Sequence, residues 1–239
     1  GNTKAVLTVE KVGKVDFPAP DIFFGNSKME VTDTDIYKSD QVFTRGQMIT
    51  VTGIDNLNEW WIDPDFFEKQ SDGTLKFLPI NGDYRVTANG ILKYFSVIAL
   101  KDGKPAKLQD DGTGAIWAIG KGIGKPSVTS SEVGWETGKA LCLAQVAPKK
   151  YQLTLKAGET LKTSGDWEAI SFKFFYQNDW GGEFSNYASN TLVEQLKLTG
   201  SGNLEMQDNK AFEEGGVYRF TIDVTNGNAN AILKVEKIN

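Results

Sequence analysis

The chain has 239 residues, a length that suits two domains of ordinary size. Its 26 Lys and Arg against 31 Asp and Glu give a formal net charge of −5, so it lacks the basic surface that nucleic-acid-binding proteins use to neutralise phosphates. It contains no histidine, which removes the commonest general base and the commonest zinc ligand and excludes Ser-His and Cys-His nucleophile systems within this chain.

Other familiar chemistries also lack a sequence signal. The single cysteine, Cys142, lies in an apolar run with no Lys or Arg directly beside it, so we expect a buried, unreactive thiol. No apolar run approaches the ~18 residues of a membrane span. Residues 120–125 carry the glycines and lysines of a phosphate-binding loop, but they lack the Walker spacing and are followed by Pro126. No EF-hand register is present, so we expect no cofactor and no metal.

The first hundred residues are predicted to form short strands separated by turns. In chain order we expect strands at 4–10, 29–36, 48–53 and 74–78. Between the last two, Asp63 is positioned to cap a short helical turn that starts at Pro64. A hairpin follows, so the segment has about seven strands in ~100 residues, which is typical of an immunoglobulin-like sandwich.

A hairpin of similar sequence occurs twice and indicates the domain organisation. Gly82-Asp83-Tyr84-Arg85-Val86-Thr87 has a counterpart in Gly216-Val217-Tyr218-Arg219-Phe220-Thr221, and an Asn-Gly turn follows each strand. Because one copy closes the chain, we expect the other to close a unit as well. Residues 101–114 are polar and turn-rich, as a linker would be. The sequence therefore predicts an all-β fold of two tandem β-sandwich domains, residues 1–107 and 108–239.

Further strands are expected throughout the second domain. Their predicted ranges are 115–120, 140–146, 151–155, 170–176, 191–198, 218–224 and 232–238. Alternation of apolar and polar residues is clearest in 218–225, where one face is predicted to enter a core and the other to meet water.

Tryptophans are the most promising functional feature. Sugar rings stack on flat aromatic side chains, while their hydroxyl groups pair with amide, carboxylate and basic groups. Trp135 lies in a polar, glycine-flanked loop and is either such a platform or a lid packed over the sandwich edge.

The other candidate glycan-binding residues each have two interpretations. Trp180 ends a strand and either packs on the sheet end or contacts ligand; Trp117 lies mid-strand and faces either the core or solvent; Trp167 follows a Ser-Gly-Asp turn. Lys173 alternates with aromatic residues and is either an ordinary solvated lysine or a donor to sugar hydroxyls. Trp60 and Trp61 are adjacent, so we expect one to be buried and the other to take part in an interdomain contact or a second platform.

Carboxylate pairs keep a hydrolase in consideration. Glycosidases need two suitably spaced carboxyl groups, and adjacent or near-adjacent pairs occur at Asp63/Asp65, Asp110/Asp111 and Glu213/Glu214. Most of these residues fall in turns, where Asp commonly serves the backbone. We therefore expect the protein not to be an enzyme.

Several motifs of the second domain occur in a recognisable order: Ile116-Trp117-Ala118-Ile119-Gly120, Gly134-Trp135, Tyr151 to Glu159, Phe172-Lys173-Phe174, Asp179-Trp180-Gly181 and Gly216 to Asp223. Together they resemble the starch-binding-type sandwiches of the outer-membrane glycan-binding lipoproteins of Bacteroidetes, the E and F components of starch-utilisation systems. In that family an immunoglobulin-like spacer precedes the glycan-binding sandwich, which matches the two predicted domains.

The resemblance implies a non-catalytic protein that holds a polysaccharide or oligosaccharide at the cell surface. It also implies an outer-membrane location through a lipid anchor and a nearby transporter complex, with Trp135 and Lys173 on the ligand side and Trp180 mainly structural. The competing hypotheses are a structural or protein-interaction subunit without a sugar site, and a β-sandwich glycoside hydrolase.

Overall fold

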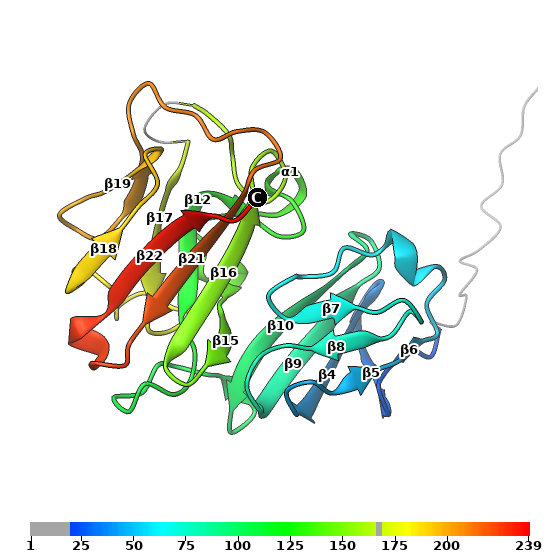
Figure 1. Ribbon diagram of the computed structural model, residues 1–239. Coiled ribbons are helices and arrows are strands. Elements are labelled where there is room, and N and C mark those ends of the chain that lie inside the picture. The colour runs from blue at the N-terminus through cyan, green and yellow to red at the C-terminus, as the bar shows by residue number, and fades with distance from the viewer. Residues whose placement is uncertain (1–19, 166–168) are drawn as a thin grey trace, which may run out of the picture.

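The computed structural model describes residues 20–165 and 169–239. It is almost entirely β-structure and forms two sandwiches that lie side by side (Figure 1). The fold class predicted from the sequence is therefore confirmed. The strand expected at residues 4–10 and the candidate Trp167 lie outside the described residues.

The N-terminal sandwich packs two small sheets against one larger antiparallel sheet. The larger sheet has the order β11-β10-β9-β4-β3, formed by β3 (Glu30–Asp33), β4 (Ile36–Phe43), β9 (Gly82–Asn89), β10 (Tyr94–Lys101) and β11 (Lys104–Pro105). The small sheets are β2-β1-β6 and β5-β8-β7, formed by β1 (Phe23–Phe24), β2 (Ser27–Lys28), β5 (Met48–Ile49), β6 (Val51–Thr52), β7 (Phe67–Lys69) and β8 (Leu75–Phe77). A 3₁₀ turn, η1, covers Leu57–Glu59.

Aromatic rings fill the space between these layers. Phe24 of β1 lies 5.1 Å from Phe95 of β10, and Phe77 of β8 lies 4.9 Å from Tyr84 of β9, measured between ring centroids. Both pairs are edge-on, the arrangement that aromatic quadrupoles favour. Alternation along β9 and β10 places these rings in the core and leaves Tyr94, Ser96 and Ile98 on the opposite face of β10.

The C-terminal sandwich has two larger sheets. One has the order β13-β12-β17-β20-β19, with β14 also paired to β12, and consists of β12 (Trp117–Gly124), β13 (Glu132–Gly134), β14 (Leu141–Cys142), β17 (Ser171–Phe175), β19 (Leu196–Leu198) and β20 (Leu204–Met206). The other has the order β15-β16-β21-β22-β18, with β15 (Ala144–Ala147), β16 (Lys150–Lys156), β18 (Ser189–Thr191), β21 (Val217–Asp223) and β22 (Ile232–Lys237). Short helical turns are α1 (Val128–Ser131), η2 (Thr137–Lys139) and η3 (Asn228–Asn230).

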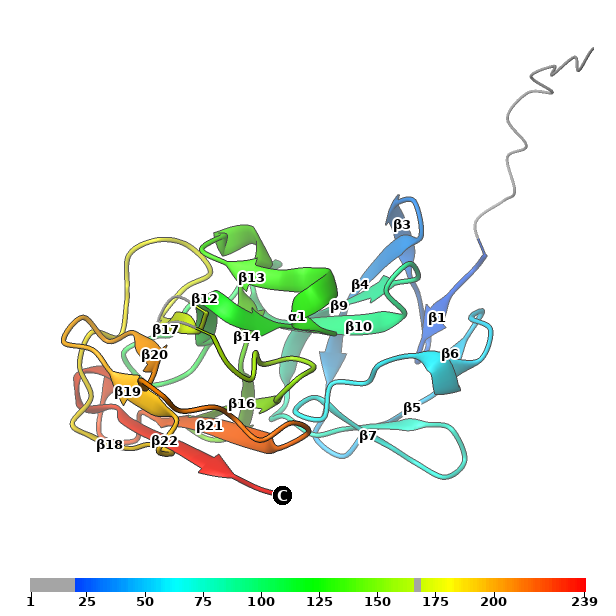
Figure 2. The same cartoon turned by 90° about the horizontal axis from the view of Figure 1, so that it is seen from above.

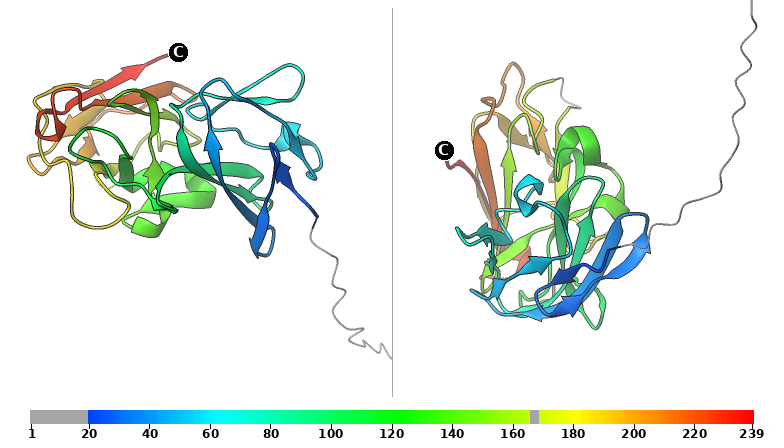
Figure 3. Two further views of the ribbon diagram at one scale, coloured as in Figure 1. Left: turned by 90° about the horizontal axis from the view of Figure 1, so that it is seen from below. Right: turned by 90° about the vertical axis from the view of Figure 1, so that its right-hand side faces the viewer.

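The two domains are in close contact rather than separated by a flexible joint. Figures 2 and 3 show the flank of the N-terminal sandwich formed by β10 lying against the region of α1 and β14. The segment expected to be a linker instead forms β11 and then packs on the second domain. The backbone N–H of Leu108 donates to the carbonyl of Tyr176 at 2.8 Å, and the indole N–H of Trp117 donates to the carbonyl of Ala106 at 3.0 Å.

Both predicted hairpins are present, but their turns differ from the expected Asn-Gly turns. In the first, four residues (90–93) connect β9 to β10, and the positive φ falls on Lys93 rather than on Gly90. In the second, η3 lies between β21 and β22. The single strand expected at 191–198 is interrupted between β18 and β19.

Candidate functional site

An aromatic cluster lies on the outer face of the β12–β17 pair. Trp117 of β12 pairs with Phe175 of β17, and Ile119 pairs with Lys173, so these four side chains share the face that points away from the sandwich core. Phe172 and Phe174 point inward, where both contact Phe220 of the other sheet. The alternation expected for this strand is confirmed.

Two tryptophans lie over this face. Trp180 contacts Phe175 edge-on, with ring centroids 6.1 Å apart, and lies nearly parallel to Trp135, with a centroid distance of 6.3 Å and an interplanar angle of 26°. Trp180 keeps 52% of its surface exposed, whereas Trp135 is partly buried against the core. We call this pair the Trp135–Trp180 platform.

Local hydrogen bonds hold Trp180 in place. Its backbone N–H donates to Asp179 Oδ1 at 2.8 Å, and its carbonyl accepts from Gln177 Nε2 at 2.7 Å. The turn is completed by Gly181 and Gly182, both at positive φ, and by a bond from the Tyr176 N–H to the Gly182 carbonyl at 2.7 Å. The exposed ring is therefore fixed on a rigid turn.

Trp135 reaches the platform from a second turn, between β13 and η2. Gly134 before it adopts φ +57° and pairs with Gly120 of β12. The Lys139 N–H donates to the Glu136 carbonyl at 3.0 Å, and their side chains form an exposed ion pair at 2.9 Å. Trp135 therefore packs on the sandwich, as one of its two interpretations expected, and its ring also stacks on the exposed Trp180.

The other candidate site residues are placed as follows. Trp117 is only 2% exposed, and its indole N–H is satisfied within the protein, so the interpretation as a glycan-binding residue is wrong: the 106–108 segment covers it. Lys173 is half-buried on the same face as Phe175, the ring that Trp180 contacts. Trp180 was expected to be mainly structural; it contacts Phe175 and Trp135, and half of its surface is exposed.

The adjacent tryptophans of the first domain divide their roles as the sequence suggested. Trp60 is buried and stacks on Phe95 at 4.6 Å. The indole N–H of Trp61 donates to Glu159 Oε1 of the second domain at 2.6 Å. Trp61 is therefore part of the interdomain contact.

A buried ion cluster, which the sequence reasoning missed, also joins the domains. Lys125, which is 5% exposed, lies 2.9 and 2.7 Å from the two carboxylate oxygens of Asp63 and 3.3 Å from Asp65 Oδ2. Asp65 also accepts bonds from Gln152 Nε2 at 2.7 Å and from the N–H and hydroxyl of Thr154, both at 2.6 Å. We call Asp63, Asp65 and Lys125 the interdomain ion cluster.

The environment of each group sets its pKa. Burial raises the pKa of Asp63 despite Lys125. Burial acts in the same direction on Asp65, but Lys125 and the hydrogen bonds from Gln152 and Thr154 outweigh it, so the pKa of Asp65 is lowered. Burial opposes the charge of Lys125, and the two carboxylates more than offset it and raise the pKa of Lys125. Asp63 is thus the first member to take up a proton as the pH falls.

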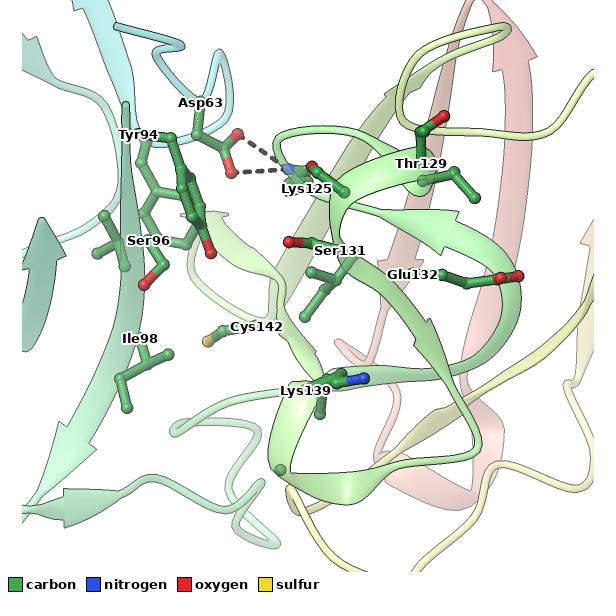
Figure 4. Close-up of a pocket in the computed structure, with 17 residues that line it drawn as sticks. Asp63, Tyr94, Ser96, Ile98, Lys125, Thr129, Ser131, Glu132, Lys139 and Cys142 are labelled. Atoms are coloured by element: carbon green, nitrogen blue, oxygen red, sulfur yellow. Dashed lines mark hydrogen bonds and ion pairs between the residues drawn. The ribbon is translucent and has the colours of Figure 1, made fainter. Parts of the chain in front are cut away.

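A cavity of about 530 Å³ lies next to this cluster, between β10 and the segment that runs through α1, β13 and β14 (Figure 4). Cys142 lines it and is 6% exposed, and burial raises the pKa of its thiol to about 12. The expectation of a buried, unreactive thiol is confirmed.

Each carboxylate pair noted in the sequence has at least one member with a structural partner. Asp63 and Asp65 belong to the ion cluster, Asp111 accepts bonds from the N–H and hydroxyl of Thr113, and Glu213 pairs with Lys237. Over residues 20–165 and 169–239, no group of three Asp, Glu, Cys or His side chains is arranged to hold a metal ion. In the same ranges no helix has the length and apolar character needed to cross a membrane.

Comparison with known families supports the division into two domains. Residues 11–108 match a family described as a domain of unknown function, DUF5125, and residues 111–225 match another domain of unknown function, DUF5121. No curated protein matches the chain. The two matches fall one in each of the two sandwiches. Neither match names a function, and the pair is compatible with the glycan-binding lipoproteins without identifying that family.

Proposed function

We propose that this protein is a non-catalytic, cell-surface polysaccharide-binding protein whose ligand stacks on the Trp135–Trp180 platform. The second sandwich carries the site, and the first acts as a spacer fixed to it. The proposal extends to an outer-membrane location through a lipid anchor and to a role beside a transporter complex. These two points rest on the resemblance to the E and F components of starch-utilisation systems.

The observation that carries the proposal is the exposure of Trp180. A tryptophan with 52% of its surface in water loses much of the stabilisation that burial gives, yet its turn is fixed by side-chain and backbone hydrogen bonds. A rigid exposed indole gives a sugar ring a flat apolar surface at little entropic cost.

Polar groups around the platform suit the rim of a sugar ring. Lys173 lies on the same sheet face as Phe175, and Asn178 and Asp179 precede Trp180 in its turn. Their amide, carboxylate and ammonium groups match the donors and acceptors of sugar hydroxyls. Because such a site is shallow, we expect a dissociation constant of order 10–1,000 μM per site.

Affinity electrophoresis tests the proposal. Native protein is run through gels that contain starch, pullulan, xyloglucan, xylan, mannan or β-glucan, next to Trp180→Ala and Trp135→Ala. We expect one polymer to retard the wild type, Trp180→Ala to lose most of the retardation, and Trp135→Ala to weaken it. Ile91→Ala, at an exposed apolar position of the first domain, is the matched control and should migrate like the wild type.

Two outcomes would contradict the proposal. Retardation that persists in Trp180→Ala would remove the platform as its cause. Absence of retardation by every polymer would favour the alternative in which the platform is a contact for another protein of a surface complex.

A further inference from the structure

The interdomain cavity has the size and place of a ligand site that is separate from the platform. Its volume of about 530 Å³ falls within the ~300–1,000 Å³ of small-molecule sites, which occur preferentially between domains. One wall is β10 of the first domain, and the other is formed by α1, β13 and β14 of the second. A molecule bound there would contact both domains.

Hydroxyl groups face the cavity from both walls. Tyr94 and Ser96 point outward from β10, and Ser131 at the end of α1 faces them in Figure 4. Each hydroxyl both donates and accepts hydrogen bonds. Ile98 and Cys142 line the same space and supply an apolar surface between these groups.

A buried carboxylate adds an acceptor to this wall. Asp63 is 6% exposed and lies beside Tyr94, with its Oδ1 accepting bonds from Lys125 and from the Asp65 N–H. Within residues 20–165 and 169–239 its Oδ2 accepts from Lys125 alone, which leaves capacity for a further donor. Lys125 directs three contacts to Asp63 and Asp65, so its protons are occupied.

The charges at the cavity disfavour an anion. The interdomain ion cluster holds two carboxylates and one ammonium, and Lys125 already compensates the carboxylate that reaches the cavity. The charged ends of Glu132 and Lys139 point away from β10 in Figure 4, and Glu132 is held by Lys162 at 2.9 Å. The groups that remain are neutral hydroxyls, one acceptor and an apolar surface.

We propose that this interdomain cavity binds a small, neutral, polyhydroxylated molecule of the size of a monosaccharide or disaccharide. Its hydroxyls bond to Tyr94, Ser96, Ser131 and Asp63, and its apolar face lies on Ile98 and Cys142. This site does not depend on the platform. The two are neighbours along the chain, because Trp135 lies three residues before Gly138 of the cavity wall. The test must therefore separate them.

Isothermal titration calorimetry on the whole chain tests the proposal, with D-glucose, D-galactose, D-mannose, D-xylose, maltose and cellobiose as probes. We expect saturable binding of at least one sugar. Ser96→Phe and Ser131→Phe fill the cavity from opposite walls and should each weaken this binding about tenfold or more. All titrations use the Trp180→Ala protein as the background, so that the platform does not contribute to the binding that is measured. Ser96→Ala removes one hydroxyl and is expected to weaken binding about fivefold, so it decides the matter if the phenylalanine variants do not fold.

Several results would overturn the proposal. These are no saturable binding of any of the six sugars by the Trp180→Ala protein, or full binding by a folded Trp180→Ala protein that also carries Ser96→Phe. Preference for gluconate or for glucosamine over glucose would contradict the neutral class of ligand. Gel retardation by a polymer that survives in Ser96→Phe supports the platform independently, so failure of one site is distinguishable from failure of the other.

Discussion

Lys125 joins the two domains through buried ion pairs. It is the one cation in a buried cluster with two carboxylates from the other domain. Attraction across a buried pair does little more than offset the cost of desolvating both groups, but removal of one partner leaves uncompensated charge. The cluster therefore contributes to the fixed placement of the domains more than to total stability.

We predict that Lys125→Met lowers the free energy of unfolding by about 3–5 kcal/mol at pH 7.5, measured by urea denaturation. The deficit should shrink as the pH falls towards 5. Burial raises the pKa of Asp63 even with Lys125 present, and loss of Lys125 removes the attraction that opposes this, so stability lost at high pH returns when Asp63 takes up a proton.

Lys150→Met is the matched control. Its ion pair with Asp223 has a similar length, 2.9 Å, but the lysine is 50% exposed, so the loss should stay below about 1 kcal/mol. A Lys125→Met deficit that is small, or that grows as the pH falls, would contradict this view of the cluster.

A second prediction concerns Gly120, where the backbones of β12 and β17 lie close together. A Cβ there would lie 2.3 Å from Phe172 Cα and 2.4 Å from the Ser171 carbonyl, at φ +140°. We expect Gly120→Ala to destabilise the protein by about 2 kcal/mol or more, because both backbone strain and overlap oppose it. Thermal unfolding checks this, with Gly200→Ala as the control, since nothing lies within 4 Å of its added Cβ. Equal melting temperatures for the two variants would contradict the argument.

Single residues also show where sequence reasoning reaches its limit. Trp180 follows a strand and Trp117 lies within one, so both were assigned two interpretations. Whether each ring is buried depends on which distant segment covers the outer face of β12 and β17. The segment that contains Ala106 covers Trp117, whereas about half of the Trp180 surface stays exposed. Likewise, Lys125 was considered only as part of a phosphate-loop pattern, since its partners lie 60 and 62 residues away.

At the scale of elements, strands with strong alternation were predicted most accurately. The strands β16, β21 and β22 fall close to their predicted ranges because their apolar period is two. The short elements β13, β20 and α1 were missed, since three or four residues show no period. The 101–114 segment was predicted as a linker from its turns and charges, whereas buried Ala106 and Leu108 fix it to the second domain.

This placement predicts resistance of the interdomain segment to proteases. Lys101 and Lys107 are exposed sites for trypsin, yet Lys101 lies in the β10–β11 pair and the backbone beside Lys107 is hydrogen-bonded to Tyr176. We expect limited trypsin digestion of the native protein to yield no pair of fragments that ends near residue 107. Rapid appearance of two domain-sized fragments, identified by mass spectrometry, would show that the segment is a flexible linker.

For the whole molecule, the contacts between domains predict coupled unfolding. The ion cluster is supplemented by Trp61 with Glu159, by Arg45 Nη1 with the Val146 carbonyl at 2.7 Å, and by the Ile80 N–H with the Gln145 carbonyl at 2.9 Å. We expect a single transition in scanning calorimetry for the wild type. Two separate transitions in the wild type would mean that the domains unfold independently.

Rigid placement also bears on function, because a spacer that cannot bend holds the platform in a fixed orientation. The ring of Trp180 is half exposed to solvent, and the interdomain cavity lies between the two sandwiches (Figure 4).

The most direct test of the central claim is to follow the tryptophan indole N–H signals in ¹⁵N NMR spectra while the oligosaccharide of the retarding polymer is added, with Trp180→Ala used to assign the Trp180 signal. Glycan binding on the platform predicts saturable shifts of Trp180 and Trp135, with Trp60 and Trp117 unmoved because both are buried. Unchanged Trp180 and Trp135 signals at saturating oligosaccharide would contradict it.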